Sequence, residues 1–202
     1  MEQREIIQEI RRTIQMEANA VKTLLDTVDM EKAAIVAEKI GTMKGKVVAA
    51  GCGTSAMGAK KIVHSLNCIE RPAVFLTPSD AVHGGLGVLQ KDDILILISK
   101  GGNTGELTQL IPACRTKGAY LIGVTEQEDS LIGQEADLCL KIKVEREPCR
   151  FNMLATASTM AVVSVFDAIC IALMTYTNYT KEQFAVIHPK GAVGERLLKK
   201  EN

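Results

Sequence analysis

Tryptophan is absent from the 202 residues, and aromatic side chains make up only 3% of the sequence. Proteins that bind single-stranded nucleic acid stack bases on aromatic rings, so such a surface is not expected here. The 24 basic and 24 acidic side chains give a formal net charge of zero. A basic stripe of the kind that binds nucleic acid is therefore not expected either, and we predict no nucleic-acid partner.

Long apolar runs and a leader segment are also lacking. No run reaches the ~20 consecutive apolar residues of a membrane-spanning helix. The chain starts with the polar sequence Met1-Glu-Gln-Arg-Glu, whereas a signal peptide carries an apolar stretch near its start. We therefore expect a cytoplasmic protein that has no membrane partner.

The six cysteines include no pair with the spacing C-x-x-C, which is typical of zinc sites and of thioredoxin-like redox sites. The three histidines are widely spaced as well, so we predict no metal site. Cys52 lies in a glycine loop before a predicted helix, where the pKa of a thiol can fall. A packing role is nevertheless the favoured interpretation of Cys52.

The composition predicts one domain preceded by a helical segment. Hydrophobic residues make up 47% of the sequence, which is ample for a packed core in a chain of this length. Residues 1–45 predict two helices, because apolar residues recur at helical spacing, as at Ile10 and Ile14. Asp29 is a candidate N-cap of the second helix and Gly41 its candidate end. We expect this segment to pack on the domain or on a partner subunit.

From Lys46 onward, short apolar strands alternate with helices. The predicted strands cover 46–51, 73–77, 93–99, 119–125 and 137–144. A predicted helix over 104–117 is one of the connections, and an almost wholly apolar helix is predicted over 156–174. Apolar strands that alternate with helices imply a parallel sheet covered on both faces. We therefore predict an α/β fold for residues 46–202, a three-layer αβα sandwich with a five-stranded parallel sheet.

Glycine-rich loops follow the first and the third predicted strand, namely Gly51-Cys-Gly-Thr-Ser-Ala and Ser99-Lys-Gly-Gly-Asn-Thr. Ligands of open parallel sheets bind beyond the carboxyl ends of the strands. Glycines let backbone N–H groups approach an anion, and hydroxyl groups add further donors. The two loops predict a phosphate site with the candidate ligands Gly53, Thr54, Ser55, Ser99, Gly101, Asn103 and Thr104. The alternative is two ordinary tight turns capped by Ser and Thr.

The first loop also fits the dinucleotide fingerprint G-x-G-x-x-A. That fingerprint requires a carboxylate at the end of the next strand, which would hold the ribose. Phe75-Leu-Thr-Pro occupies this place and carries no carboxylate. A nucleotide-dependent oxidoreductase is therefore disfavoured, and we expect no cofactor.

Three motifs resemble the sugar isomerase (SIS) family, and within it the arabinose-5-phosphate isomerases. Ile98-Ser-Lys-Gly-Gly-Asn-Thr stands where the family has its I-S-x-S-G-x-T phosphate loop. Ala81-Val-His-Gly-Gly-Leu-Gly is similar to A-x-H-G-D-L-G, and His188-Pro-Lys-Gly-Ala-Val-Gly is similar to H-P-G-G-A-L-G. The resemblance runs from about Lys46 to Leu198.

The resemblance implies a fold, an assembly and a reaction. SIS domains form homodimers or homotetramers whose sites are shared between subunits. The implied reaction converts an aldose phosphate into a ketose phosphate through an enediol, as between arabinose 5-phosphate and ribulose 5-phosphate. The matched positions make Glu147, His188 and His83 the candidate catalytic residues. A buried glutamate suits proton transfer because desolvation raises its pKa toward the working pH.

Two positions depart from the family pattern. The lysine of the G-x-G-K-S-G loop is Thr54, and the glutamate of the S-N-S-G-E-S loop is Asn103. Thr54-Ser55 is instead similar to the G-T-S of glucosamine-6-phosphate-synthesising SIS domains, and Lys100 is a candidate for returning a cation to the site. One alternative is therefore a sensor that binds a sugar phosphate or amino-sugar phosphate without turnover. Another is a 6-phospho-3-hexuloisomerase, against which the His188-Pro motif counts.

Arabinose-5-phosphate isomerases often continue into a pair of CBS domains that sense nucleotides. The sequence ends at Asn202, after the part that resembles the SIS domain. We therefore expect regulation of that kind to be absent or to come from another polypeptide.

Overall fold

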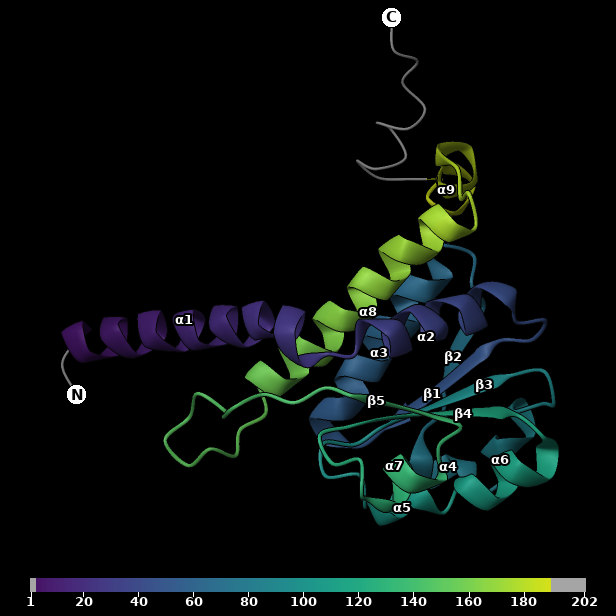
Figure 1. Ribbon diagram of the computed structural model, residues 1–202, viewed down its shortest axis with the longest axis horizontal. Helices are drawn as coiled ribbons and strands as arrows, with labels where there is room; N and C mark the ends of the chain where they lie inside the picture. Colours follow the sequence, from purple (N-terminus) through teal and green to yellow (C-terminus); the bar gives the residue numbers. More distant parts are fainter. Residues whose placement is uncertain (1–2, 190–202) are drawn as a thin grey trace, which may run out of the picture.

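A computed structural model describes residues 3–189, which form a parallel sheet between two layers of helices (Figure 1). The strands are β1 (Val47–Gly51), β2 (Ala73–Phe75), β3 (Ile94–Ile98), β4 (Tyr120–Thr125) and β5 (Leu138–Lys141). All neighbouring strands are parallel, and their order in the sheet is β2-β1-β3-β4-β5. The predicted three-layer α/β fold with five parallel strands is confirmed.

Helices cover both faces of the sheet (Figure 1). On one face lie α2 (Met30–Thr42), α3 (Gly53–Asn67) and α8 (Ala157–Tyr176), with α1 (Gln3–Thr27) packed against α8. On the other face lie α4 (Pro78–Ala81), α5 (Gly105–Thr108), α6 (Ile111–Lys117) and α7 (Leu131–Glu135). The short 3-10 helix η1 (Gly85–Val88) follows α4, and α9 (Lys181–Ile187) follows α8.

The central strand β3 explains why the strands are apolar throughout. Ile94, Ile96 and Ile98 pack in the cluster that contains α2, α3 and α8, whereas Leu95 and Leu97 pack in the cluster that contains α5, α6 and α7. Successive side chains of a strand point to opposite faces, and both faces of this sheet are covered. Every residue of β3 is therefore buried.

Both predicted N-terminal helices are present. The side chain of Asp29 accepts a hydrogen bond from the backbone N–H of Lys32 at 3.0 Å, so Asp29 caps α2 as predicted. The helix ends at Thr42, one residue beyond the predicted end at Gly41. Val36 and Ile40 of α2 are fully buried in the cluster that contains β3, so this part of residues 1–45 shares the core of the domain.

Two helical segments differ from the prediction. The helix predicted over 104–117 is divided into α5 and α6, because Pro112 has no N–H group to bond the carbonyl of Thr108 four residues earlier. The segment after Thr180 was predicted only as polar, but it forms α9. Thr180 and Gln183 make a reciprocal capping box that begins this helix.

Helix α8 is long and apolar enough to span a membrane by length and composition, with a mean hydropathy of 2.0 in an 18-residue window. Scattered small polar residues hid this feature from a search for uninterrupted apolar runs. In residues 3–189 it packs against α1, α2 and α3, and 39% of the window is buried. The core helix of a domain has the same composition, so its apolar character is weak support for a membrane segment. Its one charged residue, Asp167, pairs with Lys61 of α3.

Candidate active site

The carboxyl ends of β1 and β3 bring the two glycine loops together. Gly51 of β1 is paired in register with Ile98 of β3. The chain after β1 enters α3 on one face of the sheet, whereas the chain after β3 enters α5 on the other face. Loops that diverge in this way leave a crevice at the edge of the sheet, which is the usual ligand position in such folds.

The first loop leads directly into α3. Gly53 has a φ of +55°, which favours glycine, and Thr54 and Ser55 follow in the first turn of the helix. The first N–H groups of a helix have no partner within the helix, so they are available to an anion. Burial and the charge of Glu106 raise the pKa of the Cys52 thiol, in contrast to the lowered pKa considered for this loop.

The second loop is held by its own hydroxyl groups. The Ser99 Oγ lies 2.8 Å from the Thr104 Oγ1 and also accepts a hydrogen bond from the N–H of Gly102 at 3.1 Å. Gly102 has a φ of +69°, and a Cβ there would clash with the Ser130 side chain. A Cβ on Gly101 would meet no atom within 4 Å, so the backbone of Gly101 is open to a ligand.

Asn103 is the exception among the predicted phosphate ligands, because its side chain bonds another element. Its Oδ1 accepts a hydrogen bond from the N–H of Leu131 at 2.9 Å, at the start of α7. The residue that stands in place of the family's loop glutamate therefore connects the loop to the neighbouring helix.

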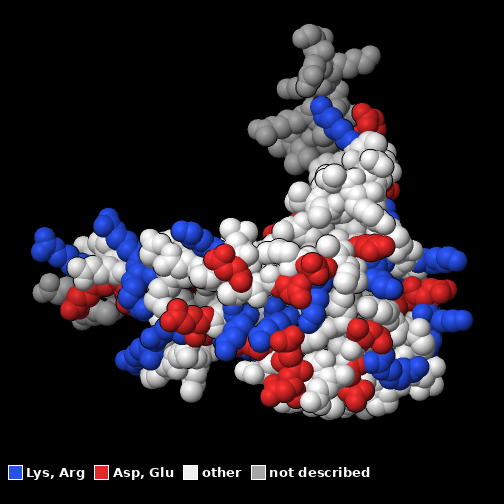
Figure 2. All heavy atoms as spheres, viewed as in Figure 1, with Lys and Arg blue, Asp and Glu red and all other residues white. Residues whose placement is uncertain are grey.

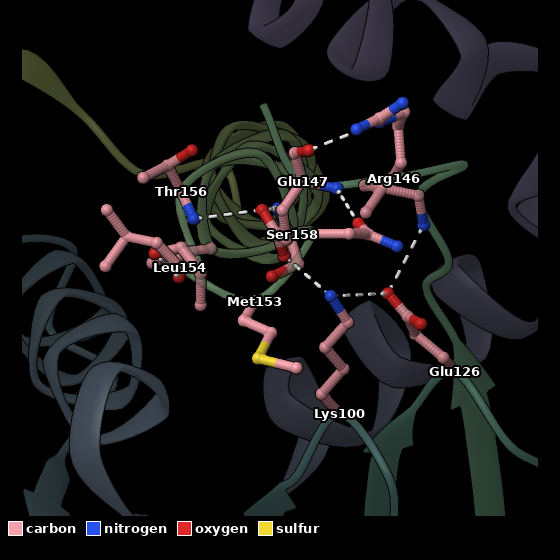
Figure 3. A network of polar contacts seen from close by, with 12 residues as sticks. Lys100, Glu126, Arg146, Glu147, Met153, Leu154, Thr156 and Ser158 are labelled. Atoms are coloured by element: carbon pink, nitrogen blue, oxygen red, sulfur yellow. Dashed lines mark hydrogen bonds and ion pairs between the residues drawn. The ribbon is translucent and has the colours of Figure 1, made fainter. Parts of the chain in front are cut away.

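Glu147 is fully buried in the loop between β5 and α8 (Figure 3). Its Oε1 accepts a hydrogen bond from the Lys100 Nζ at 2.6 Å. Its Oε2 accepts bonds from the N–H groups of Thr156 at 3.0 Å and Ser158 at 3.4 Å. The carboxylate thus satisfies donors at the start of α8 and holds a cation from the second glycine loop.

The pKa of Glu147 is lowered, in contrast to the raised pKa expected for a buried glutamate. Burial raises the pKa, but the hydrogen bonds from Lys100, Ser158 and Thr156 and the charge of Lys100 together outweigh it. The pKa therefore lies below its ordinary value of 4.5, and Glu147 is ionised at neutral pH.

Lys100 lies between two carboxylates (Figure 3). Its Nζ is 2.6 Å from the Glu147 Oε1 and 3.8 Å from the Glu126 Oε1, and Glu126 directly follows β4. Lys100 and Glu126 line a cavity of about 30 Å³ together with Ser55 and Gly58 of α3, Ser158 and Thr159 of α8, and the ends of β3 and β4. The cavity therefore lies between the start of α3 and the charged cluster of Lys100, Glu126 and Glu147.

The two candidate histidines lie outside this cluster. His83 is exposed in the turn between α4 and η1, after the carboxyl end of β2. His188 follows α9, where its ring stacks on Phe184 with ring centroids 4.0 Å apart. Helix α8 has 20 residues, or about 30 Å at 1.5 Å per residue, and it separates His188 from Glu147. The rest of the His188 motif, residues 190–198, lies outside the described residues.

Sequence reasoning missed Glu126 and assigned no contact to Lys100. The only signal for Glu126 was its place directly after the predicted strand 119–125, at the edge of the sheet where ligands bind. Within residues 3–189, no group of three or more His, Cys, Asp or Glu side chains is arranged to hold a metal ion.

Comparisons with known proteins agree on one family and one fold. The family model described as the SIS domain matches residues 42–172. A solved structure of a candidate sugar-phosphate isomerase from Listeria monocytogenes is 64% identical, with a TM-score of 0.93 over 94% of this chain and all of that chain. A protein of Escherichia coli CFT073, solved in complex with arabinose 5-phosphate, is 31% identical, with a TM-score of 0.89 over 94% of this chain and all of that chain.

Curated relatives extend beyond the aligned part. Arabinose 5-phosphate isomerase KdsD of Pseudomonas aeruginosa is 36% identical over 198 residues, which are 97% of this chain and 60% of that protein. Arabinose 5-phosphate isomerase GutQ of Escherichia coli K12 is 38% identical over 157 residues, which are 78% of this chain and 49% of that protein. The chain thus spans about half to three fifths of the length of these relatives.

Proposed function

Because this chain belongs to the SIS domain family, we propose that it is an isomerase that interconverts an aldose phosphate and a ketose phosphate. The pair arabinose 5-phosphate and ribulose 5-phosphate is the proposed substrate and product, since several curated relatives are named arabinose 5-phosphate isomerases. The observation that carries the proposal is the Lys100–Glu147 ion pair beside two glycine loops at the carboxyl edge of the sheet.

The phosphate group of the sugar is proposed to bind between the two loops. Gly53, Thr54 and Ser55 would offer N–H and hydroxyl donors at the start of α3, where the helix dipole favours an anion. From the second loop, the open backbone at Gly101 and the hydroxyl of Thr104 would complete the site, with Ser99 holding that hydroxyl. Asn103 would act indirectly, because it connects this loop to α7.

The reaction requires a proton transfer between adjacent carbon atoms and a cation that stabilises the enediolate. Lys100 carries a positive charge and lines the cavity, and the ionised Glu147 fixes the position of its Nζ. A cation held in place beside the reacting atoms stabilises the negative charge that develops there. In principle, this chemistry needs no organic cofactor.

Glu147, His83 and His188 remain the proposed catalytic residues from the family resemblance. Glu147 would act as the ionised partner of Lys100. His188 lies about 30 Å from Glu147 along α8 of the same chain. We therefore propose a homodimer or homotetramer in which a second copy completes the site with a histidine.

The cytoplasm is the proposed location of the protein. All six cysteines lie in residues 3–189 and are unpaired there. Unpaired cysteines fit a reducing compartment, where disulfides are rare.

A panel of pentose, hexose and hexosamine phosphates tests the proposed activity. Each compound is first tested for thermal stabilisation of the protein, and each one that binds is then tested for conversion. We expect arabinose 5-phosphate to stabilise the protein and to be converted to a ketose phosphate.

The same panel separates the isomerase from the sensor. Clear binding of a sugar phosphate without conversion of any pentose or hexose phosphate would contradict the isomerase and favour a sensor. Thr54 and Asn103, which replace the family's lysine and glutamate, would be the reason for that outcome.

A further inference from the structure

The two carboxylates beside Lys100 differ in how much of each is available to a ligand (Figure 3). Glu147 is fully buried, and both of its oxygens accept hydrogen bonds, Oε1 from Lys100 and Oε2 from Thr156 and Ser158. Three donors thus occupy most of the acceptor positions of this buried carboxylate, which leaves few of them for a substrate.

Glu126 has the features that Glu147 lacks. Its side chain is 11% exposed and lines the cavity next to Lys100 and Ser55. Its Oε1 accepts a long hydrogen bond of 3.4 Å from the N–H of Val144. Among residues 3–189, no group donates a hydrogen bond to its Oε2. A substrate group that lies between Ser55 and Lys100 would therefore lie beside a carboxylate with a free oxygen.

Resting on the isomerase function proposed above, we propose that Glu126 is the general base of the reaction. It moves a proton between the two reacting carbon atoms of the sugar phosphate. This proposal replaces the catalytic role that the family resemblance gives to Glu147: Glu147 becomes a positioning residue, because it acts on the substrate through Lys100.

The proton transfer balances within the substrate and Glu126. The Glu126 carboxylate takes the proton from C2 of the open-chain aldose, and the electrons of that C–H bond form the C1=C2 double bond. The π electrons of the C1 carbonyl move onto O1, and the charge on O1 is stabilised by the Lys100 ammonium group. The proton of the C2 hydroxyl then passes to O1, Glu126 returns its proton to C1, and C2 becomes the ketone.

The size of the cavity fits this division of labour. A volume of about 30 Å³ admits one or two small groups and not a whole sugar phosphate. The reacting end of the sugar would therefore enter between Lys100 and Glu126. The phosphate would stay outside at the start of α3, where the glycine loops offer donors.

The charges around Glu126 suit a general base. Burial has the largest effect on the pKa of Glu126 and raises it. The charge of Lys100 and the hydrogen bond from the Val144 N–H lower this pKa, whereas the charge of Glu147 raises it and that of Lys143 lowers it. The pKa as a whole lies above the ordinary value of 4.5. The pKa of Glu147 is shifted in the opposite direction. Opposite shifts of two neighbouring carboxylates are typical of sites in which the two groups have different roles. Glu126 also restores a carboxylate to a site whose second loop carries Asn103 in place of glutamate.

The decisive experiment compares Glu126→Gln with the unmodified protein in D₂O, using the sugar phosphate that the panel identifies. We expect kcat to fall by about two to four orders of magnitude, the usual contribution of a general base. Deuterium incorporation from solvent into the carbon-bound positions should fall with it, while KM changes by less than about threefold. Glu126→Asp keeps a carboxylate and should recover part of kcat.

Glu128→Gln is the matched control. Glu128 lies two residues further along the chain and pairs with Lys32 and Lys141 at the surface, outside the cavity. Its substitution should leave kcat and deuterium incorporation unchanged.

The unmodified protein supplies a readout that needs no variant. The acid limb of its kcat/KM profile should have its midpoint above pH 4.5, because this profile reports the free protein, in which the base must be deprotonated. If Glu126→Gln does not fold, the acid limb of this pH profile and the kcat of Glu126→Asp test the role of Glu126 instead. Conversion by the unmodified protein with kcat of Glu126→Gln within threefold would overturn the role of Glu126 alone. No conversion of any sugar phosphate by the unmodified protein would overturn the isomerase and the role of Glu126 together.

Discussion

Glu147 shows at the scale of single residues how one buried charge can serve both the fold and the site. Its carboxylate accepts N–H groups at the start of α8 and an ammonium group from the second glycine loop. Leaving a buried, ionised carboxylate without one of its partners costs free energy. Glu147 therefore fixes Lys100 and the start of α8 relative to each other. The position of the cation thus depends on the same bonds that begin the helix.

The substitution Glu147→Gln should lower the free energy of unfolding by about 2 kcal/mol at pH 7. The reason is the loss of a buried ion pair whose lysine partner is partly screened by solvent. The pKa of Glu147 is lowered in the folded state, so its contribution is complete above pH 4.5 and is lost as the pH falls through the folded-state pKa. Urea unfolding at pH 7 and pH 3.5 measures both effects.

The difference in the free energy of unfolding between Glu147→Gln and the unmodified protein should therefore be smaller at pH 3.5 than at pH 7. A difference that stays constant from pH 7 to pH 3.5 would show that the charge of Glu147 is not responsible. Glu145→Gln, in the same loop but exposed, is the control and should leave stability unchanged at both pH values.

At the scale of elements, the sequence was most informative where both faces of a segment are buried. The apolar runs predicted β1, β3 and β4 to within a residue or two, because a strand covered on both faces has no polar side to interrupt the pattern. The division of the helix over 104–117 was missed although Pro112 marked it, and α9 was missed although Thr180 and Gln183 have capping-box spacing.

The candidate site was predictable only in its local parts. The two glycine loops are contiguous in sequence, and their adjacency follows from the parallel order of β1 and β3. The Lys100–Glu147 pair joins residues 47 positions apart, and no local pattern indicates that contact. Glu126 was missed for the same reason, since its role depends on a cavity formed by separate elements of the chain.

The two glycine loops should no longer bind phosphate when one hydroxyl group is removed from each of them. We expect inorganic phosphate at millimolar concentration to raise the melting temperature of the unmodified protein. The double substitution Ser55→Ala with Thr104→Val should abolish this stabilisation, because it removes a donor from each side of the proposed site. Thermal unfolding with and without phosphate measures the effect.

A double substitution in the same two helical segments serves as the control for the loops. Ser65→Ala with Thr108→Val removes one hydroxyl from α3 and one from α5, away from the strand ends. This variant should keep the stabilisation by phosphate. Equal stabilisation of both double variants would sink the proposed phosphate site.

At the scale of the whole molecule, α1 contributes little to the core of its own chain. The first half of α1 extends away from the sheet (Figure 1), and Leu24 is its only buried residue among residues 3–27. Arg12 of α1 donates a hydrogen bond to the carbonyl of Pro148 at 2.6 Å, directly beside Glu147. A contact that fixes the position of α1 therefore also helps to fix the loop that carries Glu147.

Within residues 3–189, the groove between α1, α2 and α8 has no charged residue in its lining. A groove of about 370 Å³ lies between α1, α2 and α8, and its lining is Val21, Leu24, Leu25, Val28, Met30, Ala33, Ala34, Ala37, Ser164, Val165, Ala168, Ile169 and Ala172. In the view of Figure 2, basic and acidic side chains are intermixed over the body of the molecule, while the outer part of α8 is largely uncharged. A surface of this kind is typical of an interface between copies.

The last prediction concerns this interface. The side chains of Ile6, Ile7, Ile10 and Ile14 form a stripe along α1 and are 42–61% exposed in the single chain. Burial of each side chain in an oligomer would contribute about 1 kcal/mol or more. Light scattering at micromolar concentration should therefore give a mass that is a multiple of 21.8 kDa.

The double substitution Ile10→Glu with Ile14→Glu should shift the mass toward 21.8 kDa, because it places two charges in the stripe. Gln8→Glu with Gln15→Glu adds the same two charges on the opposite side of α1 and should leave the oligomer intact. A mass of 21.8 kDa for the unmodified protein would contradict the assembly, and with it the proposal that a second copy supplies a histidine to the site.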